Sequence, residues 1–170
     1  MRRVLQPGGA HLDPERTAAR MSIVRFINVF TAGIVAGAAA MELAVLIPAL
    51  RATSQSTLLE AHRAIAPRAA RAVPIPGALA TICGAVVVFE HDLGDVATLL
   101  TIAALVAWIA AVLTTFLVYV PLLETVSRLD AGTDAAERDS VVGRWASVHL
   151  VRTVLFLCGF GLFVAAALAA

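Results

Sequence analysis

Three residues in one short stretch carry side chains that can exchange a proton, hold an anion and stack on an aromatic ring. In RWASVHLVR (residues 144–152), Trp145, His149 and Arg152 stand four and three positions apart. Residues with this spacing share one face of a helix, and Phe156 continues the same face. A histidine exchanges a proton near neutral pH, and an arginine presents a planar, permanently charged fork. The pattern predicts one wall of a binding or catalytic site.

A lone carboxylate stands in an apolar stretch elsewhere in the chain. Glu42 lies within SIVRFINVFTAGIVAGAAAMELAVLIPAL, which covers residues 22–50. A charged group deep in a membrane helix costs at least about 2.5 kcal/mol, so such a residue is a functional candidate. We therefore group Glu42 with His149 and Arg152 as candidate catalytic residues. A purely structural Glu42–Arg152 ion pair is the alternative.

The composition indicates that these residues belong to an integral membrane protein. Of the 170 residues, 60% are hydrophobic and 15% are charged, and the mean hydropathy is +0.88. These values are far from those of soluble domains. The net charge of +1 provides no electrostatic reason to bind nucleic acid. The predicted surroundings are therefore a lipid bilayer, and nucleic acid is not an expected partner.

Four apolar stretches are long enough to cross a hydrocarbon core of about 30 Å. They cover about residues 22–50, 73–89, 96–123 and 147–169. Short connections make consecutive helices antiparallel, and a backbone in lipid must satisfy its own hydrogen bonds. The predicted fold is an all-α, integral membrane four-helix bundle in up-down-up-down order.

Two further segments complete the predicted organisation. Residues 1–21 are polar and contain two Pro and two Gly, so we predict a flexible tail before a transmembrane domain at 22–170. The connection between the first two spans contains STLLEAHRAIA, an amphipathic pattern typical of a short helix at the membrane surface.

The predicted order gathers polar and aromatic residues at one end of the bundle. There the first and third helices end and the second and fourth begin, which predicts a polar pocket opening to one membrane face. Milder interpretations remain open: Trp145 as an interfacial belt residue, Arg152 reaching the head groups, or Glu124 paired with Arg128 one turn away. The residues gathered at this end are Glu42, His62, Tyr119, Glu124, Trp145, His149 and Arg152.

A metal site is the competing interpretation of the same pocket. His62 and His149, with Glu42 or Glu124, would form a two-histidine, one-carboxylate set suited to non-haem iron or copper. These residues are far apart in the sequence and have no ligand-like spacing. The chain shows no glycine-rich nucleotide loop and no haem-attachment motif, so no organic cofactor is expected.

The sequence contains weaker signals for the oligomeric state and for the orientation in the membrane. Gly33 and Gly37 stand four positions apart, as in small-residue faces that bring helices together, and they predict a homo-oligomer contact. Arginines gather in the two larger connections, at 51–72 and 124–146, which favours these connections on the cytoplasmic side. The expected location is a bacterial cytoplasmic membrane.

One sequence motif gives information on the family that composition does not provide. YVPLLETV closes the third span, with Pro121 in it, and RWASVHLVRT opens the fourth. This arrangement resembles the anthrone oxygenase-like family of small four-helix membrane proteins, whose signature pairs a proline-containing end of helix three with Trp-x-x-x-His/Asn-x-x-Arg. One departure is that Leu123 and Glu124 stand where many relatives carry two asparagines.

The resemblance implies an oxygenase that uses dioxygen as co-substrate on an aromatic substrate, an anthrone-like polyketide or a related phenol. In that reaction His149 would act as the base and Arg152 would hold the resulting anion. Trp145 and Phe156 would stack on the substrate ring, and Tyr119 and Glu124 would line its site. A non-enzymatic membrane subunit, or a protein that binds a small molecule or a metal, is the alternative function.

Overall fold

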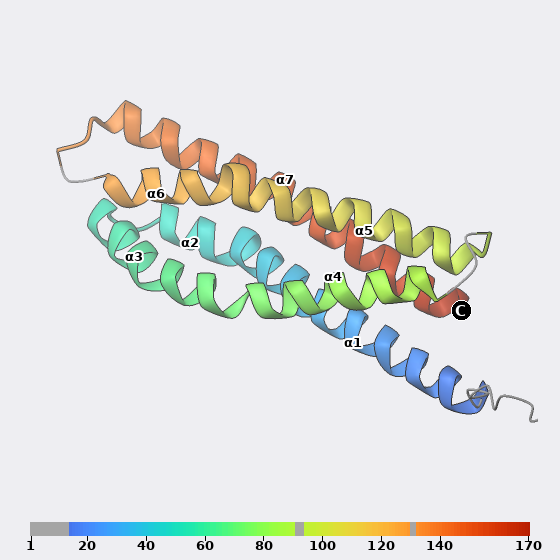
Figure 1. Ribbon diagram of the computed structural model, residues 1–170. Helices are drawn as coiled ribbons and strands as arrows, with labels where there is room; N and C mark the ends of the chain where they lie inside the picture. Colours follow the sequence, from blue (N-terminus) through green and yellow to red (C-terminus); the bar gives the residue numbers. More distant parts are fainter. Residues whose placement is uncertain (1–13, 91–93, 130–131) are drawn as a thin grey trace, which may run out of the picture.

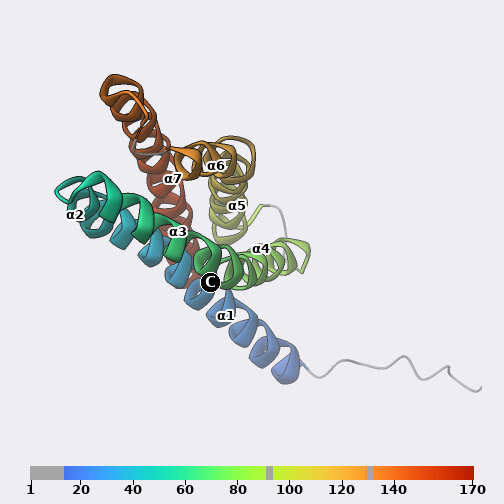
Figure 2. The ribbon, with the colours of Figure 1, turned by 90° about the vertical axis from the view of Figure 1, so that its left-hand side faces the viewer.

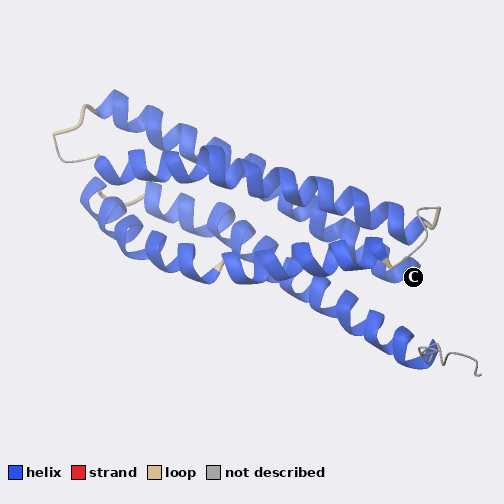
Figure 3. Ribbon diagram, in the orientation of Figure 1, coloured by secondary structure: helices blue, strands red, loops and turns tan. Residues whose placement is uncertain are grey.

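The computed structural model describes residues 14–90, 94–129 and 132–170. The described residues form helices joined by short turns and contain no strand (Figure 3). The helices are arranged in four long rods, each made of one or more consecutive helices, and consecutive rods run in opposite directions (Figure 1). The predicted all-α four-helix bundle is thereby confirmed.

Three of the four rods are built from more than one helical segment. Short π-helical segments interrupt the first and third rods, whereas a bend at Val73 separates the two helices of the second. Four described stretches are long and apolar enough to cross a membrane. The segments in chain order are α1 (Pro14–Met41), η1 (Glu42–Leu46), α2 (Ile47–Arg51), α3 (Gln55–Ala72), α4 (Pro74–Phe89), α5 (Val96–Thr114), η2 (Thr115–Tyr119), α6 (Val120–Arg128) and α7 (Ala135–Ala169).

Several predicted boundaries were wrong because helices continue past the end of the apolar stretches. Helix α1 begins at Pro14 rather than at residue 22, so residues 14–21 are helical, and residues 1–13 lie outside the described part. Helix α7 begins at Ala135 rather than near 147, where the Asp134 carboxylate accepts the N–H of Ala136 at 3.2 Å. Capping groups, rather than hydrophobicity, set where a helix starts.

The connecting helix also differs from the prediction. The helix is present between the first two spans but longer than predicted, since α3 has 18 residues and leads through Val73 directly into α4. Ser54 caps its start by accepting the N–H of Thr57 at 3.3 Å. Together α3 and α4 form a rod that continues to the end of the bundle and packs beside α2 and α6 (Figures 1 and 2).

Small residues let the rods approach closely. A side chain at Gly84 would meet Leu105, Phe163 and Asn28 at 3.1–3.2 Å, and one at Gly159 would meet the Ala104 carbonyl at 3.2 Å. Such close packing replaces the hydrophobic driving force that is missing between helices in lipid. Within the bundle, α7 packs mainly on α5 and α1, and α1 also packs on α4.

The two glycines predicted to form an oligomer contact differ in their surroundings. A side chain at Gly33 would lie 3.2 Å from the Phe160 ring of the same chain, whereas nothing lies within 4 Å of one at Gly37. Gly33 therefore serves packing between α1 and α7, and only Gly37 is open to a second copy. The homo-oligomer stays a prediction.

Each π-helical segment stands directly before a proline. The N–H of Ile47, just before Pro48, bonds to the carbonyl of Glu42, and that of Val120, just before Pro121, bonds to the carbonyl of Thr115. Proline has no N–H and its ring collides with the carbonyl four residues earlier, so a wider turn relieves the conflict. Such π turns are frequent at functional sites.

The order of the rods leads to a labelling prediction. In a protein with Cys83 and Cys158 replaced by alanine, a membrane-impermeant maleimide should modify Gly94→Cys and Ala170→Cys from one side of the membrane and Ala136→Cys from the other. The expected result follows because the start of α5 and the C-terminus lie at one end of the bundle and the start of α7 at the opposite end (Figure 1). Modification of all three from one side would contradict the four crossings.

Candidate functional site

The carboxylate of Glu42 lies where three rods meet. It stands on the first residue of η1, faces Tyr119 on the last residue of η2, and contacts two residues of α7. The Tyr119 hydroxyl donates to Oε1 at 2.5 Å. Arg152 Nη2 lies 3.4 Å from Oε2, and His149 Nδ1 lies 3.8 Å from the same oxygen. The ion pair with Arg152, which the sequence left as an alternative, is therefore present.

The imidazole of His149 has a partner at each nitrogen. Arg152 Nη2 lies 3.0 Å from Nδ1, and the Ala39 carbonyl oxygen lies 3.1 Å from Nε2. A guanidinium only donates, so Nδ1 accepts and Nε2 carries the hydrogen that is donated to Ala39. His149 is completely buried, and it thereby joins α7 to α1.

The guanidinium of Arg152 is stacked as well as paired. Its Cζ lies 3.9 Å above the Tyr119 ring and 6.0 Å from the Phe156 ring. A cation placed over an aromatic face in this way is more often arginine than lysine. Within the described part of the chain, Arg152 Nε is a buried donor without a hydrogen-bond partner, whereas the indole N–H of Trp145 lies beside the Tyr119 hydroxyl. Unpaired buried donors are uncommon in folded proteins, so Arg152 Nε is available to an acceptor that the protein itself does not supply.

The aromatic residues expected to stack on a substrate instead pack on other side chains. Trp145 meets His62 edge to face with ring centres 5.8 Å apart, and Phe156 meets Trp108 with ring centres 4.8 Å apart. Both Trp145 and Phe156 are buried. The expected open slot between them is therefore filled in this structure, and a flat ligand reaches them only if these side chains move.

Glu124 does not join the cluster. Its side chain is 66% exposed and lies 3.9 Å from Arg128 one helical turn later. This is the structural pairing that the sequence offered as the milder interpretation. Glu124 lies outside the cluster because it follows Tyr119 by five positions and so points about 140° away around an α-helix, and its place in a substrate site stays a prediction.

The predicted three-ligand metal set is likewise not assembled. No group of three or more His, Cys, Asp or Glu side chains suited to a metal ion occurs among the residues that the structure describes. His62 packs on Trp145, and both nitrogens of His149 already have partners. Metal content stays a matter for direct measurement.

Two contributors to the site were not anticipated. One is the Ala39 carbonyl, which receives His149 and, at 3.4 Å, the Thr153 hydroxyl. No side-chain pattern reveals a backbone group. The other is Trp108, which supports Phe156 and Phe163. Its position in the middle of an apolar span, away from the usual interfacial belt of tryptophans, was the available signal.

The four residues of the cluster differ in how far their side chains are exposed. The Glu42 side chain is 26% exposed, whereas Tyr119, His149 and Arg152 are all buried. A cavity of about 190 Å³ lies at this end of the bundle, but other residues line it. A second cavity near Arg25 and Asn28 measures only about 10 Å³, less than the volume one water needs. Among the four residues of the cluster, Glu42 is thus the one that an incoming molecule meets first.

The contacts of His149 predict a loss of stability on its removal. His149→Ala should lower the free energy of unfolding by about 2–4 kcal/mol, because it opens a buried hole and removes the link between α7 and the Ala39 carbonyl. Thermal unfolding in detergent would measure the change. An unchanged melting temperature would contradict this expectation. His91 is a histidine outside the described residues, so His91→Ala serves as a control for histidine removal in general.

Comparison with known proteins adds a family to this geometry. A family model described as anthrone oxygenase matches residues 62–162, which is more than half of the chain. The matched region includes Tyr119, Trp145, His149, Arg152 and Phe156, whereas Glu42 lies before it. No curated protein matches the chain, and no solved structure does.

Proposed function

Because the chain belongs to the anthrone oxygenase family, we propose that it is a membrane-embedded oxygenase that acts on an anthrone-like polyketide or a related phenol. Overall, a ring methylene group and dioxygen become a ring carbonyl and water. Removal of one proton from the methylene group leaves an electron-rich anion that reacts with dioxygen, so dioxygen is the co-substrate and no organic cofactor is required. The proposed location is a bacterial cytoplasmic membrane.

The proposal gives the role of base to the carboxylate of Glu42. The supporting observation is its placement within a membrane-crossing rod, held by Tyr119 and Arg152 with part of its surface still exposed. His149 was the base expected from the family resemblance. Its Nδ1 accepts from Arg152 and its Nε2 donates to Ala39, so it has no free lone pair. In this proposal His149 positions Arg152 instead.

Arg152 and Trp145 are proposed to hold the substrate anion. Arg152 Nε is a buried donor without a protein partner, and an enolate or phenolate oxygen is the acceptor that such a donor favours. Trp145 would contribute its indole N–H, which lies beside the Tyr119 hydroxyl in this structure. In surroundings of low polarity, a pre-placed donor stabilises a developing anion strongly. Arg152 would thus serve three groups at once: Glu42 and His149 through Nη2, and the substrate through Nε.

The closed packing sets a condition on this mechanism. Trp145 and Phe156 lie against His62 and Trp108, so a flat substrate has to enter beside Glu42 and displace one of these rings. The same packing favours a second candidate function, a non-enzymatic membrane subunit in which Glu42, Arg152 and His149 only clamp three rods together.

Dioxygen consumption distinguishes the two functions. Purified protein in detergent should consume dioxygen in the presence of an anthrone and form the corresponding anthraquinone in a one-to-one ratio. Anthrones also oxidise spontaneously, so the rate is compared with that of an equal amount of His149→Ala, Glu42→Gln and protein-free detergent. Equal rates in all samples would favour the non-enzymatic subunit. Elemental analysis of the same sample would show whether iron or copper accompanies activity.

A further inference from the structure

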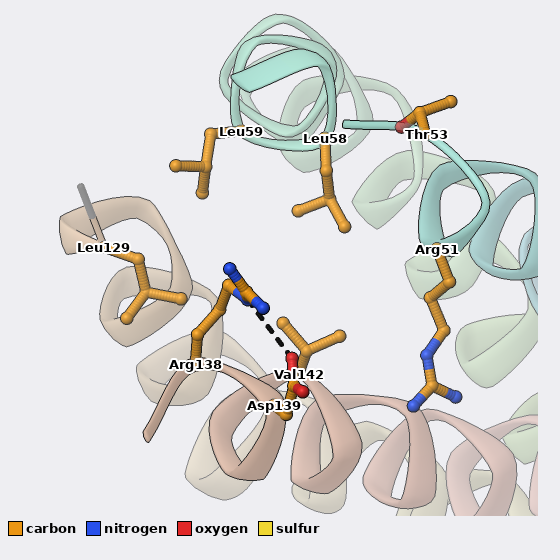
Figure 4. Close-up of a pocket in the computed structure, with 8 residues that line it drawn as sticks. All are labelled: Arg51, Thr53, Leu58, Leu59, Leu129, Arg138, Asp139 and Val142. Carbon is orange, nitrogen blue, oxygen red and sulfur yellow. Dashed lines mark hydrogen bonds and ion pairs between the residues drawn. The ribbon is translucent and has the colours of Figure 1, made fainter. Parts of the chain in front are cut away.

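A cavity lies at one end of the bundle, apart from the Glu42 cluster, which consists of Glu42, Tyr119, His149 and Arg152. The cavity of about 190 Å³ opens between α2, α3, the end of α6 and the start of α7. Figure 4 shows the leucines of α3 pointing into it from one side and Arg138, Asp139 and Val142 of α7 forming the other. Its lining residues are Arg51, Thr53, Leu58, Leu59, Leu129, Arg138, Asp139 and Val142.

Among the described residues that line this cavity, two are positively charged and one is negatively charged. Arg51 and Arg138 line it together with one carboxylate, that of Asp139. Arg138 Nε donates to Asp139 at 3.1 Å, whereas Arg51 forms no ion pair with any described residue. In Figure 4 the guanidinium of Arg51 points toward α7, across the cavity from the leucines. An unpaired guanidinium beside a recess favours an anionic oxygen group.

The remaining walls are apolar, and the volume limits what fits. Leu58, Leu59, Leu129 and Val142 line the cavity, and three of these four are buried. A cavity of about 150 Å³ is enough for one benzene molecule. The space therefore suits a single ring or a head group, and it is too small for three fused rings. The proposed anthrone site is thus a different place.

We propose that this cavity is a binding site for one anionic oxygen group, a carboxylate or phosphate, carried on a small apolar body. Arg51 holds the anion, and Leu58 and Leu59 cover the apolar part. Arg51 lies about 13 Å along the rod from Glu42, at 1.5 Å per residue, which is a depth suited to lipid head groups when Glu42 is in the hydrocarbon region. The anion is supplied either by an anionic phospholipid or by a free single-ring aromatic acid.

Two binding measurements on the full chain in uncharged maltoside detergent distinguish these sources. In one, radiolabelled benzoate is titrated by equilibrium dialysis. In the other, phosphatidylglycerol is added to the micelles and bound lipid is counted by native mass spectrometry. We expect one saturable site per chain in at least one measurement. Saturation by benzoate alone assigns an aromatic acid, and saturation by phosphatidylglycerol alone assigns a lipid.

Matched variants test the part played by Arg51. Arg51→Gln should weaken binding about tenfold, as expected for loss of one charge-assisted contact. Arg144→Gln removes an exposed arginine at the same end that does not line the cavity, and it should leave binding unchanged. If Arg51→Gln fails to fold, Leu58→Phe, which fills the cavity, should abolish binding instead.

Three results would overturn the proposal: no saturable binding of either probe, equal binding by wild type and Arg51→Gln, or equal weakening by both arginine variants. The last would indicate general attraction to a positive end of the bundle. Neither Arg51 nor Leu58 belongs to the Glu42 cluster, so any of these results leaves the proposed oxygenase function untouched.

Discussion

Glu42→Gln should lower the anthrone-dependent rate of dioxygen uptake by about 100-fold or more, since a positioned base contributes about 10²–10⁴ to a rate. Glutamine has nearly the same shape and keeps an acceptor for the Tyr119 hydroxyl, but it cannot take up the substrate proton. The variant should still insert and fold as a helical bundle. Initial rates of dioxygen uptake, measured beside far-ultraviolet circular dichroism, would show both effects.

Glu124→Gln is the matched control for this experiment. Glu124 lies on the same end of the bundle, but its side chain is exposed and paired with Arg128. Its replacement should leave the rate within about twofold of wild type, because exposed ion pairs contribute little. If Glu42→Gln is folded and fully active, Glu42 is not the base, and His149 regains that role only if Arg152 moves away from its Nδ1.

Arg152→Met should cause the largest loss of stability, about 3–5 kcal/mol, because it leaves the partly buried Glu42 carboxylate without its cation inside a membrane-crossing rod. The guanidinium also stacks 3.9 Å from the Tyr119 ring centre, so packing is lost with the charge. The double variant Glu42→Gln/Arg152→Met should regain much of this stability, since it removes both charges together. Thermal unfolding of wild type, the two single variants and the double variant provides the double-mutant cycle.

Activity should separate from stability in the same series. The double variant should stay inactive although it is more stable than Arg152→Met, because neither a base nor an anion holder remains. Arg152→Lys should also lose most activity, since lysine keeps the charge but lacks the planar fork. If the double variant is as unstable as Arg152→Met, the pair does not couple. If Arg152→Lys is fully active, Arg152 acts only as a charge.

Much of this molecule was predictable from its sequence because the relevant properties are local. Length and apolarity decide whether a segment crosses a membrane, and short connections decide the antiparallel order. The spacing of Trp145, His149 and Arg152 places them on one side of α7, and all three are buried in the bundle. The free-energy cost of a charge in lipid identified Glu42 as a residue of interest, and the Glu42–Arg152 ion pair that the sequence left as an alternative is present.

Other features depended on contacts between rods, which no local pattern contains. Three helices begin before their apolar stretches do. Helices α3 and α7 begin directly after the capping residues Ser54 and Asp134, and α1 begins at Pro14. The pairing of His149 with the Ala39 carbonyl turned an expected base into a link between helices. The side chain of Glu124 is exposed and paired with Arg128, so it lies outside the cluster around Glu42.

The rotation of each helix about its own axis is the physical reason for this division. A period of 3.6 residues tells which side chains share a face, but only packing decides where that face points. Pro48 and Pro121 add a further uncertainty, because each is preceded by a π turn that holds one extra residue and shifts every later side chain around the axis. The sequence by itself therefore determined that four segments are long and apolar enough to cross a membrane and which residues share a face. The tertiary structure alone decided that Glu42 and Tyr119, at the two π turns, meet Arg152 and His149 in one closed cluster.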